Sequence, residues 1–164
     1  MMSKKMIAAL NNQIQAELYS SYLYLAMAAY CERQNLKGFA HWMNLQADEE
    51  RAHAMRFFNF LLENGEKVAL KALDQPPADF GTPKQMFGKV LDHEKKITGL
   101  IHKLYRLALD EKDYRSQIML QWFVSEQMEE EAQAQFIVTR IEQVDGKMSA
   151  VLWIDKELGK RGKD

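Results

Sequence analysis

Apolar side chains recur along most of the chain with a period near 3.6 residues, which is typical of amphipathic helices. Four long segments show this period, and most of the glycines and prolines outside them gather between the second and the third. The pattern predicts helices over about residues 3–33, 35–64, 82–108 and 113–144. A shorter amphipathic segment, from Met148 to Leu158, follows them.

Residues at the segment ends support these bounds. Asn35 is the expected N-cap of the second helix. Thr82 is the expected N-cap of the third, with Pro83 in the first helical position. Asp145 followed by Gly146 is a helix-stop signal after the fourth.

The connections between the segments predict how the helices are arranged. The first and second helices, and the third and fourth, are joined by only a few residues, so each pair should be antiparallel. The link from Gly65 to Thr82 is long enough to travel the roughly 40 Å length of a helix of this size. Helices two and three should therefore be parallel. We expect an all-α four-helix bundle with a long crossover between helices two and three and a short fifth C-terminal helix.

Length and composition narrow the class of protein. The 164 residues suit a single domain over 1–164, with the bundle over about 3–145 and the fifth helix over about 147–159. A net charge of −1 argues against a nucleic-acid binder. No apolar stretch approaches the roughly 18 residues of a membrane span, and the N-terminal residues lack the apolar segment of a secretory signal peptide. Cys31 is the only cysteine, so no intrachain disulfide can form and a cytoplasmic location is expected.

Acid and imidazole groups interrupt the apolar stripes near the helix centres. Each long segment has one glutamate at this height, namely Glu17, Glu50, Glu94 and Glu130. His53 lies three residues after Glu50 and therefore faces the same way. Because mid-helix residues of an up-and-down bundle meet at mid-height, these side chains should share one layer.

Ionised carboxylates in one dry layer require positive charge beside them. Burying each one costs several kcal/mol, and the four would also repel one another. No Lys or Arg lies near them in their own stripes. Two divalent cations would balance the four formal charges, and oxygen-rich ligation with one imidazole suits iron or manganese.

Taken singly, these residues have ordinary explanations. A glutamate on a helix usually faces solvent, and a lone histidine such as His53 is more often structural than a ligand. Tyr24, Trp122 and Phe123 lie at helical spacings that are typical of core packing. The coincidence of four stripes interrupted at one depth favours a buried metal site.

Longer motifs carry a resemblance to a known family. They run from Glu17 to Tyr22, from Glu49 to His53, over His93-Glu94, and from Gln121 to Glu131. With these motifs the chain resembles bacterial non-haem ferritins over essentially its full length, including the closing segment from Ile154 to Leu158. The resemblance implies a ferritin-like bundle.

The same resemblance implies a ferroxidase centre that binds Fe²⁺ and Fe³⁺. Glu17, Glu50 and His53 would hold the first iron. Glu50 would bridge to the second iron, which Glu94 and Glu130 also bind.

Bacterial ferritins also have a third iron position, which would use Glu49, Glu126 and Glu129 here and share Glu130. The first three each precede an inward-facing residue by one, so they turn by about 100° toward one flank of the bundle. By pattern alone they are typical of solvated surface acids. It is the resemblance that favours the third position.

Two details separate this chain from other proteins of the same fold. Symmetric di-iron proteins repeat Glu-x-x-His, whereas here the second copy is Gln127-x-x-Glu130, with Gln127 beside the centre and Tyr24 hydrogen-bonding near it. Bacterioferritins have a haem-binding Met directly after the bridging glutamate, where this chain has Arg51. We therefore expect no haem.

The implied function is iron storage with ferroxidase activity. Dioxygen or hydrogen peroxide would oxidise the iron, and a hollow shell of twenty-four subunits would hold the ferric mineral. The fifth helices of neighbouring subunits would pack around the four-fold axes of this shell. Its apolar face needs a partner that neighbouring copies could supply, and it consists of Val151, Leu152, Ile154 and Leu158.

Two other functions are compatible with the pattern. One is a discrete di-iron oxidoreductase that has the bundle but stores no iron. The other is a structural or interaction bundle whose acids are satisfied by protons or water.

Overall fold

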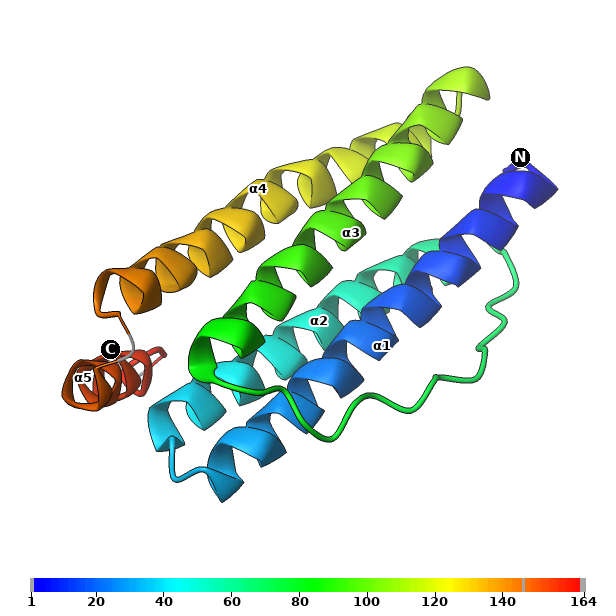
Figure 1. Ribbon diagram of the computed structural model, residues 1–164. Coiled ribbons are helices and arrows are strands. Elements are labelled where there is room, and N and C mark those ends of the chain that lie inside the picture. The colour runs from blue at the N-terminus through cyan, green and yellow to red at the C-terminus, as the bar shows by residue number, and fades with distance from the viewer. Residues whose placement is uncertain (1, 146, 163–164) are drawn as a thin grey trace.

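The computed structural model describes residues 2–145 and 147–162, and over these residues the chain is helical without strands. The helices are α1 (Lys4–Arg33), α2 (Lys37–Glu63), α3 (Pro83–Asp110), α4 (Tyr114–Gln143) and α5 (Met148–Leu158) (Figure 1). The all-α prediction is confirmed, and each element lies within a few residues of its expected bounds. The assignment of the whole chain to one domain stays a prediction.

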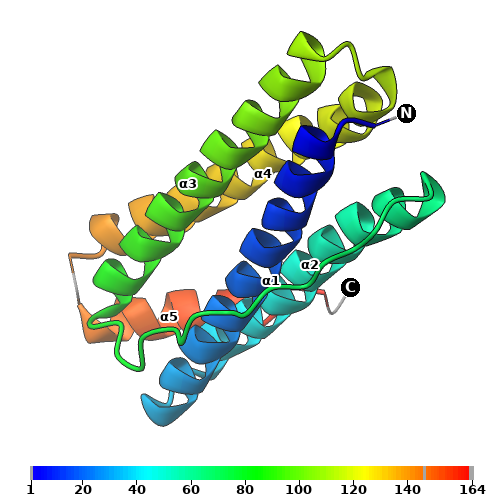
Figure 2. The ribbon, with the colours of Figure 1, turned by 90° about the vertical axis from the view of Figure 1, so that its right-hand side faces the viewer.

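The long helices form two antiparallel pairs, α1 with α2 and α3 with α4 (Figure 1). The segment between α2 and α3 runs along the length of the bundle and returns the chain to the end at which α2 began (Figure 2). Helices α2 and α3 are therefore parallel, as the length of the link predicts. No helix among the described residues combines the length and apolar character needed to cross a membrane.

Side-chain caps begin three of the long helices. Ser3 Oγ accepts a hydrogen bond from the backbone N–H of Met6 at 3.0 Å. Thr82 and Gln85 form a reciprocal capping box, with Pro83 at the start of α3 as predicted. The carboxylate of Asp113 caps α4.

The predicted cap of α2 is wrong. Asn35 has a φ of 58° and forms the turn, while Leu36 is the N-cap and makes no side-chain hydrogen bond. Asparagine tolerates the left-handed conformation, which explains why it occupies the turn and not the N-cap position. The free N–H of Phe39 is satisfied from α5, where Asp155 Oδ1 accepts it at 2.8 Å.

Helix α4 ends close to the predicted stop signal. Its last residue is Gln143, and Asp145 takes a left-handed φ of 46°. Gly146, the second residue of that signal, lies outside the described residues.

Helix α5 packs across the start of α2. Its buried residues, Val151 and Ile154, join the core of the same chain, so this part of the apolar face is covered without a neighbouring copy. Leu152 remains 49 % exposed. A Cβ on Gly38 would lie 1.6 Å from the carbonyl oxygen of Asp155, so glycine permits this close approach.

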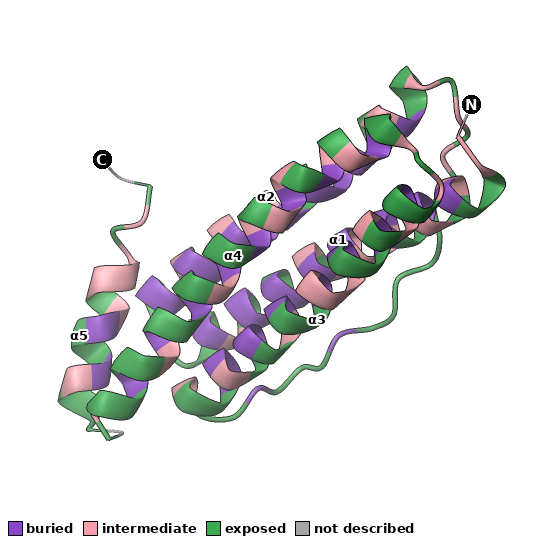
Figure 3. Ribbon diagram, turned by 90° about the horizontal axis from the view of Figure 1, so that it is seen from above, coloured by how far each residue is buried: buried purple, intermediate pink, exposed green. Residues whose placement is uncertain are grey.

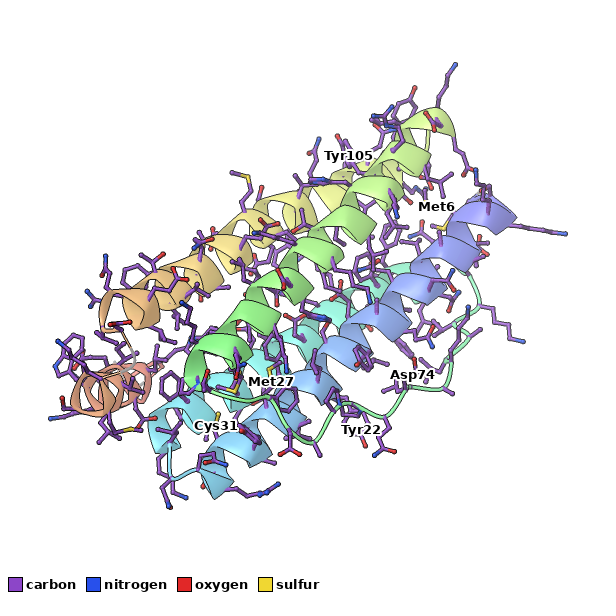
Figure 4. All side chains as sticks on the ribbon, in the orientation of Figure 1. Met6, Tyr22, Met27, Cys31, Asp74 and Tyr105 are labelled. Carbon is purple, nitrogen blue, oxygen red and sulfur yellow. The ribbon has the colours of Figure 1, made fainter. Side chains whose placement is uncertain are left out.

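The core consists of two hydrophobic clusters separated by polar side chains. One cluster includes Met6, Phe57 and Phe123, and the other includes Met27 and Cys31. Met6 and Cys31 lie toward opposite ends of α1 (Figure 4). Buried positions follow the faces that the long helices turn toward one another (Figure 3). The apolar stripes expected from the sequence lie on these buried faces, although two positions that share the stripe spacing, Ser21 and Phe60, are only half-buried.

Candidate metal centre

A layer of buried polar side chains lies between the two hydrophobic clusters. Each long helix contributes one glutamate to it, and every one of them is at most 3 % exposed. These are the four predicted mid-helix acids, Glu17, Glu50, Glu94 and Glu130. The helical period explains why they are buried, because each occupies a stripe position that faces the bundle interior.

Two overlapping groups of these side chains could each hold a metal ion. Glu17, Glu50 and His53 offer ligand atoms that all lie within 4.8 Å of one another. Glu50, Glu94 and Glu130 meet the same criterion. We call these the inner groups. Glu50 belongs to both, so one carboxylate can touch two neighbouring ions.

A third group, which we call the outer group, lies beside the inner ones. It contains Glu49, His53, Glu126 and Glu130, again with ligand atoms within 4.8 Å of one another. Glu49 and Glu126 are half-buried. Glu129, the remaining residue expected here, is exposed and belongs to none of the groups found among the described residues.

His53 connects the inner and outer groups. Its Nδ1 lies 3.3 Å from Glu50 Oε2, and its Nε2 lies 3.8 Å from Glu126 Oε1. The rings of Trp122 and Phe123 pack edge-on against the imidazole, with centroids 5.5 and 5.8 Å away. The aromatic contacts therefore orient the two nitrogens toward different carboxylates.

One oxygen of Glu17 has no hydrogen-bond partner in the part of the chain that the structure describes. Gln13 Nε2 donates to Glu17 Oε1 at 2.8 Å, while Glu17 Oε2 is buried without a hydrogen bond among the described residues. Leaving a buried acceptor unpaired costs about 1–3 kcal/mol. A cation beside Glu50 and His53 would remove this cost, so the geometry fits a metal ligand.

Glu94 is held by the two residues predicted to lie near the centre. The hydroxyl of Tyr24 donates to Glu94 Oε1. Gln127 Nε2 donates to Glu94 Oε2 at 3.2 Å and also lies 3.4 Å from Thr98 Oγ1. Both therefore orient a carboxylate that could bind metal.

Burial makes this layer electrostatically unfavourable without a cation. Desolvation raises the pKa of Glu17 well above its usual range, and the neighbouring Glu50 adds to the effect. Burial, with repulsion from Glu94 and Glu130, raises the pKa of Glu50 likewise. Burial beside Glu94 raises the pKa of Glu130 to about 8. A divalent ion would reverse this trend because opposite charge favours the ionised carboxylate.

Two residues at the site were not predicted from the sequence. Gln46 donates to Glu130 Oε2 at 2.6 Å and lies 3.4 Å from Glu50 Oε1. Its place four residues before Glu50 on the same stripe is a signal that could have found it. Arg161 contacts Gln46 and Glu49 from beyond α5, and nothing in its local sequence marks it.

Comparison with known proteins agrees with this geometry. A family model described as "Ferritin-like domain" matches residues 7–144. The chain belongs to the ferritin family. Membership implies iron binding, and supports iron storage and ferroxidase chemistry in general.

Similar ferritins cover nearly the whole chain. The bacterial non-heme ferritin of Bacteroides fragilis (strain 638R) is 40 % identical over 161 residues, which is 98 % of this chain and 100 % of that protein. The corresponding protein of Staphylococcus aureus (strain MRSA252) is 34 % identical over 98 % of this chain and 97 % of its own length.

A solved structure extends the likeness to the fold. The chain matches an open pore ferritin from the hyperthermophilic archaeon Archaeoglobus fulgidus with a TM-score of 0.97 and 45 % identity, covering 98 % of this chain and 99 % of that one. The ferritin-like bundle predicted from the sequence is confirmed.

Proposed function

We propose that this protein stores iron and oxidises Fe²⁺ to Fe³⁺ as it enters. The observation that carries the proposal is the buried pair of inner groups that share Glu50, with an oxygen on Glu17 that has no hydrogen bond among the described residues. A bundle that bound no cation would keep this layer at a cost in stability. Family membership supports iron as the metal that this layer binds.

In this proposal the inner groups bind two Fe²⁺ ions as substrate. Glu17, Glu50 and His53 hold the first, and Glu50, Glu94 and Glu130 hold the second. The distances among their ligand atoms support both assignments. Gln127 and Tyr24 keep Glu94 aimed at the second ion.

The shared carboxylate favours oxidation of the two ions as a pair. Each Fe²⁺ loses one electron, and one dioxygen accepts both electrons with two protons to form hydrogen peroxide. Hydrogen peroxide can itself accept two electrons and two protons to form two waters. Acid groups with raised pKa values, such as Glu130, lose protons when the ions bind and so supply protons beside the reacting ions.

The outer group is the proposed third position, through which oxidised iron leaves the pair. Glu49, Glu126, Glu130 and His53 offer ligand atoms that lie within 4.8 Å of one another there. Glu129 faces solvent one residue before Glu130, and its part in this position rests on the family resemblance alone.

Storage requires a closed particle, and we propose a homo-oligomeric shell of twenty-four subunits in the cytoplasm. Exposed apolar side chains supply surface for contacts between copies, among them Ile118 at 72 %, Met128 at 71 % and Phe136 at 61 %. The A. fulgidus relative is described as an open pore ferritin, a property of that protein.

Adding Fe²⁺ in air to the metal-free protein tests this function. We expect a soluble brown particle whose size by exclusion chromatography is that of a large shell. Glu50→Ala should lose paired iron binding and slow oxidation by at least about tenfold. Glu63→Ala, at an exposed position of the same helix, should change neither.

Two results would contradict the proposal in different ways. A colourless solution that precipitates rust would exclude storage. A monomer or dimer that binds two ions without forming mineral would indicate the discrete di-iron oxidoreductase instead.

A further inference from the structure

Arg161, in the short segment after α5, folds back onto α2. Its Nη1 donates to Gln46 Oε1 at 2.8 Å, and its Nη2 donates to Glu49 Oε2 at 2.6 Å. The guanidinium carbon lies 5.0 Å from the centroid of the Trp42 ring. The backbone carbonyl of Arg161 lies 2.8 Å from His41 Nε2, so the main chain is held as well. Four side chains of one helix thus fix this residue.

One of these contacts engages the outer group directly. Glu49 is a member of that group, and the guanidinium binds the carboxylate that would face a metal ion there. The Arg161 side chain is 24 % exposed and that of Glu49 is 34 % exposed, so solvent screens the pair only in part. A metal ion and Arg161 must therefore compete for Glu49.

A second contact reaches the outer group through Gln46. Because Arg161 binds Oε1 of this amide, the Nε2 group is turned toward the carboxylates. It donates to Glu130 Oε2 at 2.6 Å. Arg161 thus acts on two outer ligands, Glu49 directly and Glu130 through the orientation of Gln46.

We propose that Arg161 is a resident cation that lowers the affinity of the outer position for metal ions. This inference rests on the proposed function, because it assigns a control to the outer position of the same site. An ion that enters must displace the guanidinium from Glu49, so it is held less tightly than the inner pair. Weak binding suits a position that iron occupies only in passing. When the ion leaves, the guanidinium of Arg161 binds Glu49 again.

Titration of the metal-free, full-length protein with Zn²⁺, which undergoes no oxidation, tests the proposal by calorimetry. Arg161→Gln should tighten the outer site by about threefold to fivefold, the upper part of the range that a partly exposed ion pair supports. The two inner affinities should stay within about twofold. Arg161→Lys should give an intermediate value, because one ammonium on a shorter reach cannot hold Gln46 and Glu49 in the same fork.

Lys160→Gln is the matched control. It removes the same charge one residue earlier, where the ammonium pairs with Glu157 at 2.7 Å instead of reaching the site. It should leave the outer affinity unchanged. Zinc anomalous scattering from crystals of both variants identifies which position each ion occupies.

The outcomes separate the two proposals. The role of Arg161 is overturned if Arg161→Gln binds the outer ion no more tightly than the unmodified protein, or if Lys160→Gln gives the same gain. Absence of ions from the inner groups would instead overturn the proposed function, whatever Arg161 does.

Discussion

The pKa of Glu130 shows how burial in the metal-free site affects a single carboxyl group. Burial and the neighbouring Glu94 raise its pKa from 4.5 to about 8. The folded metal-free protein therefore binds more protons at this carboxyl than the unfolded chain does between these two values. Its free energy of unfolding must fall as the pH rises through this window. Glu17 and Glu50 have pKa values raised in the same direction.

The metal-free protein should accordingly melt at a higher temperature at about pH 5 than at about pH 8. Glu130→Gln cannot ionise, so its melting temperature should change less between these two conditions. Calorimetry of both proteins after chelation measures the difference. A melting temperature that rises with pH in the unmodified protein would show that these carboxyls are not strained by burial.

The outer group allows a comparison of two neighbouring acids on α4. Glu126 Oε1 lies 3.8 Å from His53 Nε2, close enough for one ion to contact both, whereas Glu129 is exposed. Glu126→Gln should therefore weaken the third metal position by at least about tenfold, and Glu129→Gln by much less. Pairwise oxidation should be largely retained in both. The measurement is the affinity for a third ion after the inner pair is filled, and equal losses would return Glu129 to the ligand set.

At the scale of residues, the helical period predicts which side chains face one another. It does not predict which of them are fixed by hydrogen bonds. Glu17, Glu50, Glu94 and Glu130 are predictable because each interrupts an apolar stripe at the same height. Their hydrogen bonds depend on rotamers and on contacts between helices, so the sequence does not predict that Gln46 contacts Glu130. The sequence carries no local signal for Arg161, because a non-periodic tail is placed by tertiary packing alone.

At the scale of elements, the junction of α2 with α5 decides where the C-terminal segment lies. The two helices meet at Gly38, and Asp155 satisfies the N–H of Phe39 from across the junction. A helix start without its own side-chain cap is therefore completed by a remote element. The sequence pattern predicts Asn35 as this cap, because Asn is favoured both at N-caps and in left-handed turns.

Gly38→Ala should destabilise the protein, although alanine normally favours a helix over glycine by about 1 kcal/mol. The added Cβ would overlap the carbonyl oxygen of Asp155 and force α5 away from α2. Gly88→Ala on α3 is the matched control, since its Cβ would have nothing within 4 Å. Melting temperatures should fall for the first variant and hold or rise for the second. Equal changes would mean that α5 does not dock at this point.

At the scale of the whole molecule, two hydrophobic clusters enclose one polar layer. The clusters exclude water from the layer, which makes its carboxylates costly without cations and strong ligands for them. The bundle and its crossover were predictable, because helix length and loop length are local properties. The docking of α5 onto its own chain was not, since an apolar face does not reveal which surface covers it.

Crystals of the protein soaked in Fe²⁺ and recorded at the iron absorption edge test the central claim most directly. Anomalous peaks should lie among Glu17, Glu50 and His53 and among Glu50, Glu94 and Glu130, with a weaker third peak beside Glu49 and Glu126. A map without peaks in the two inner groups would contradict the claim that cations hold this layer together.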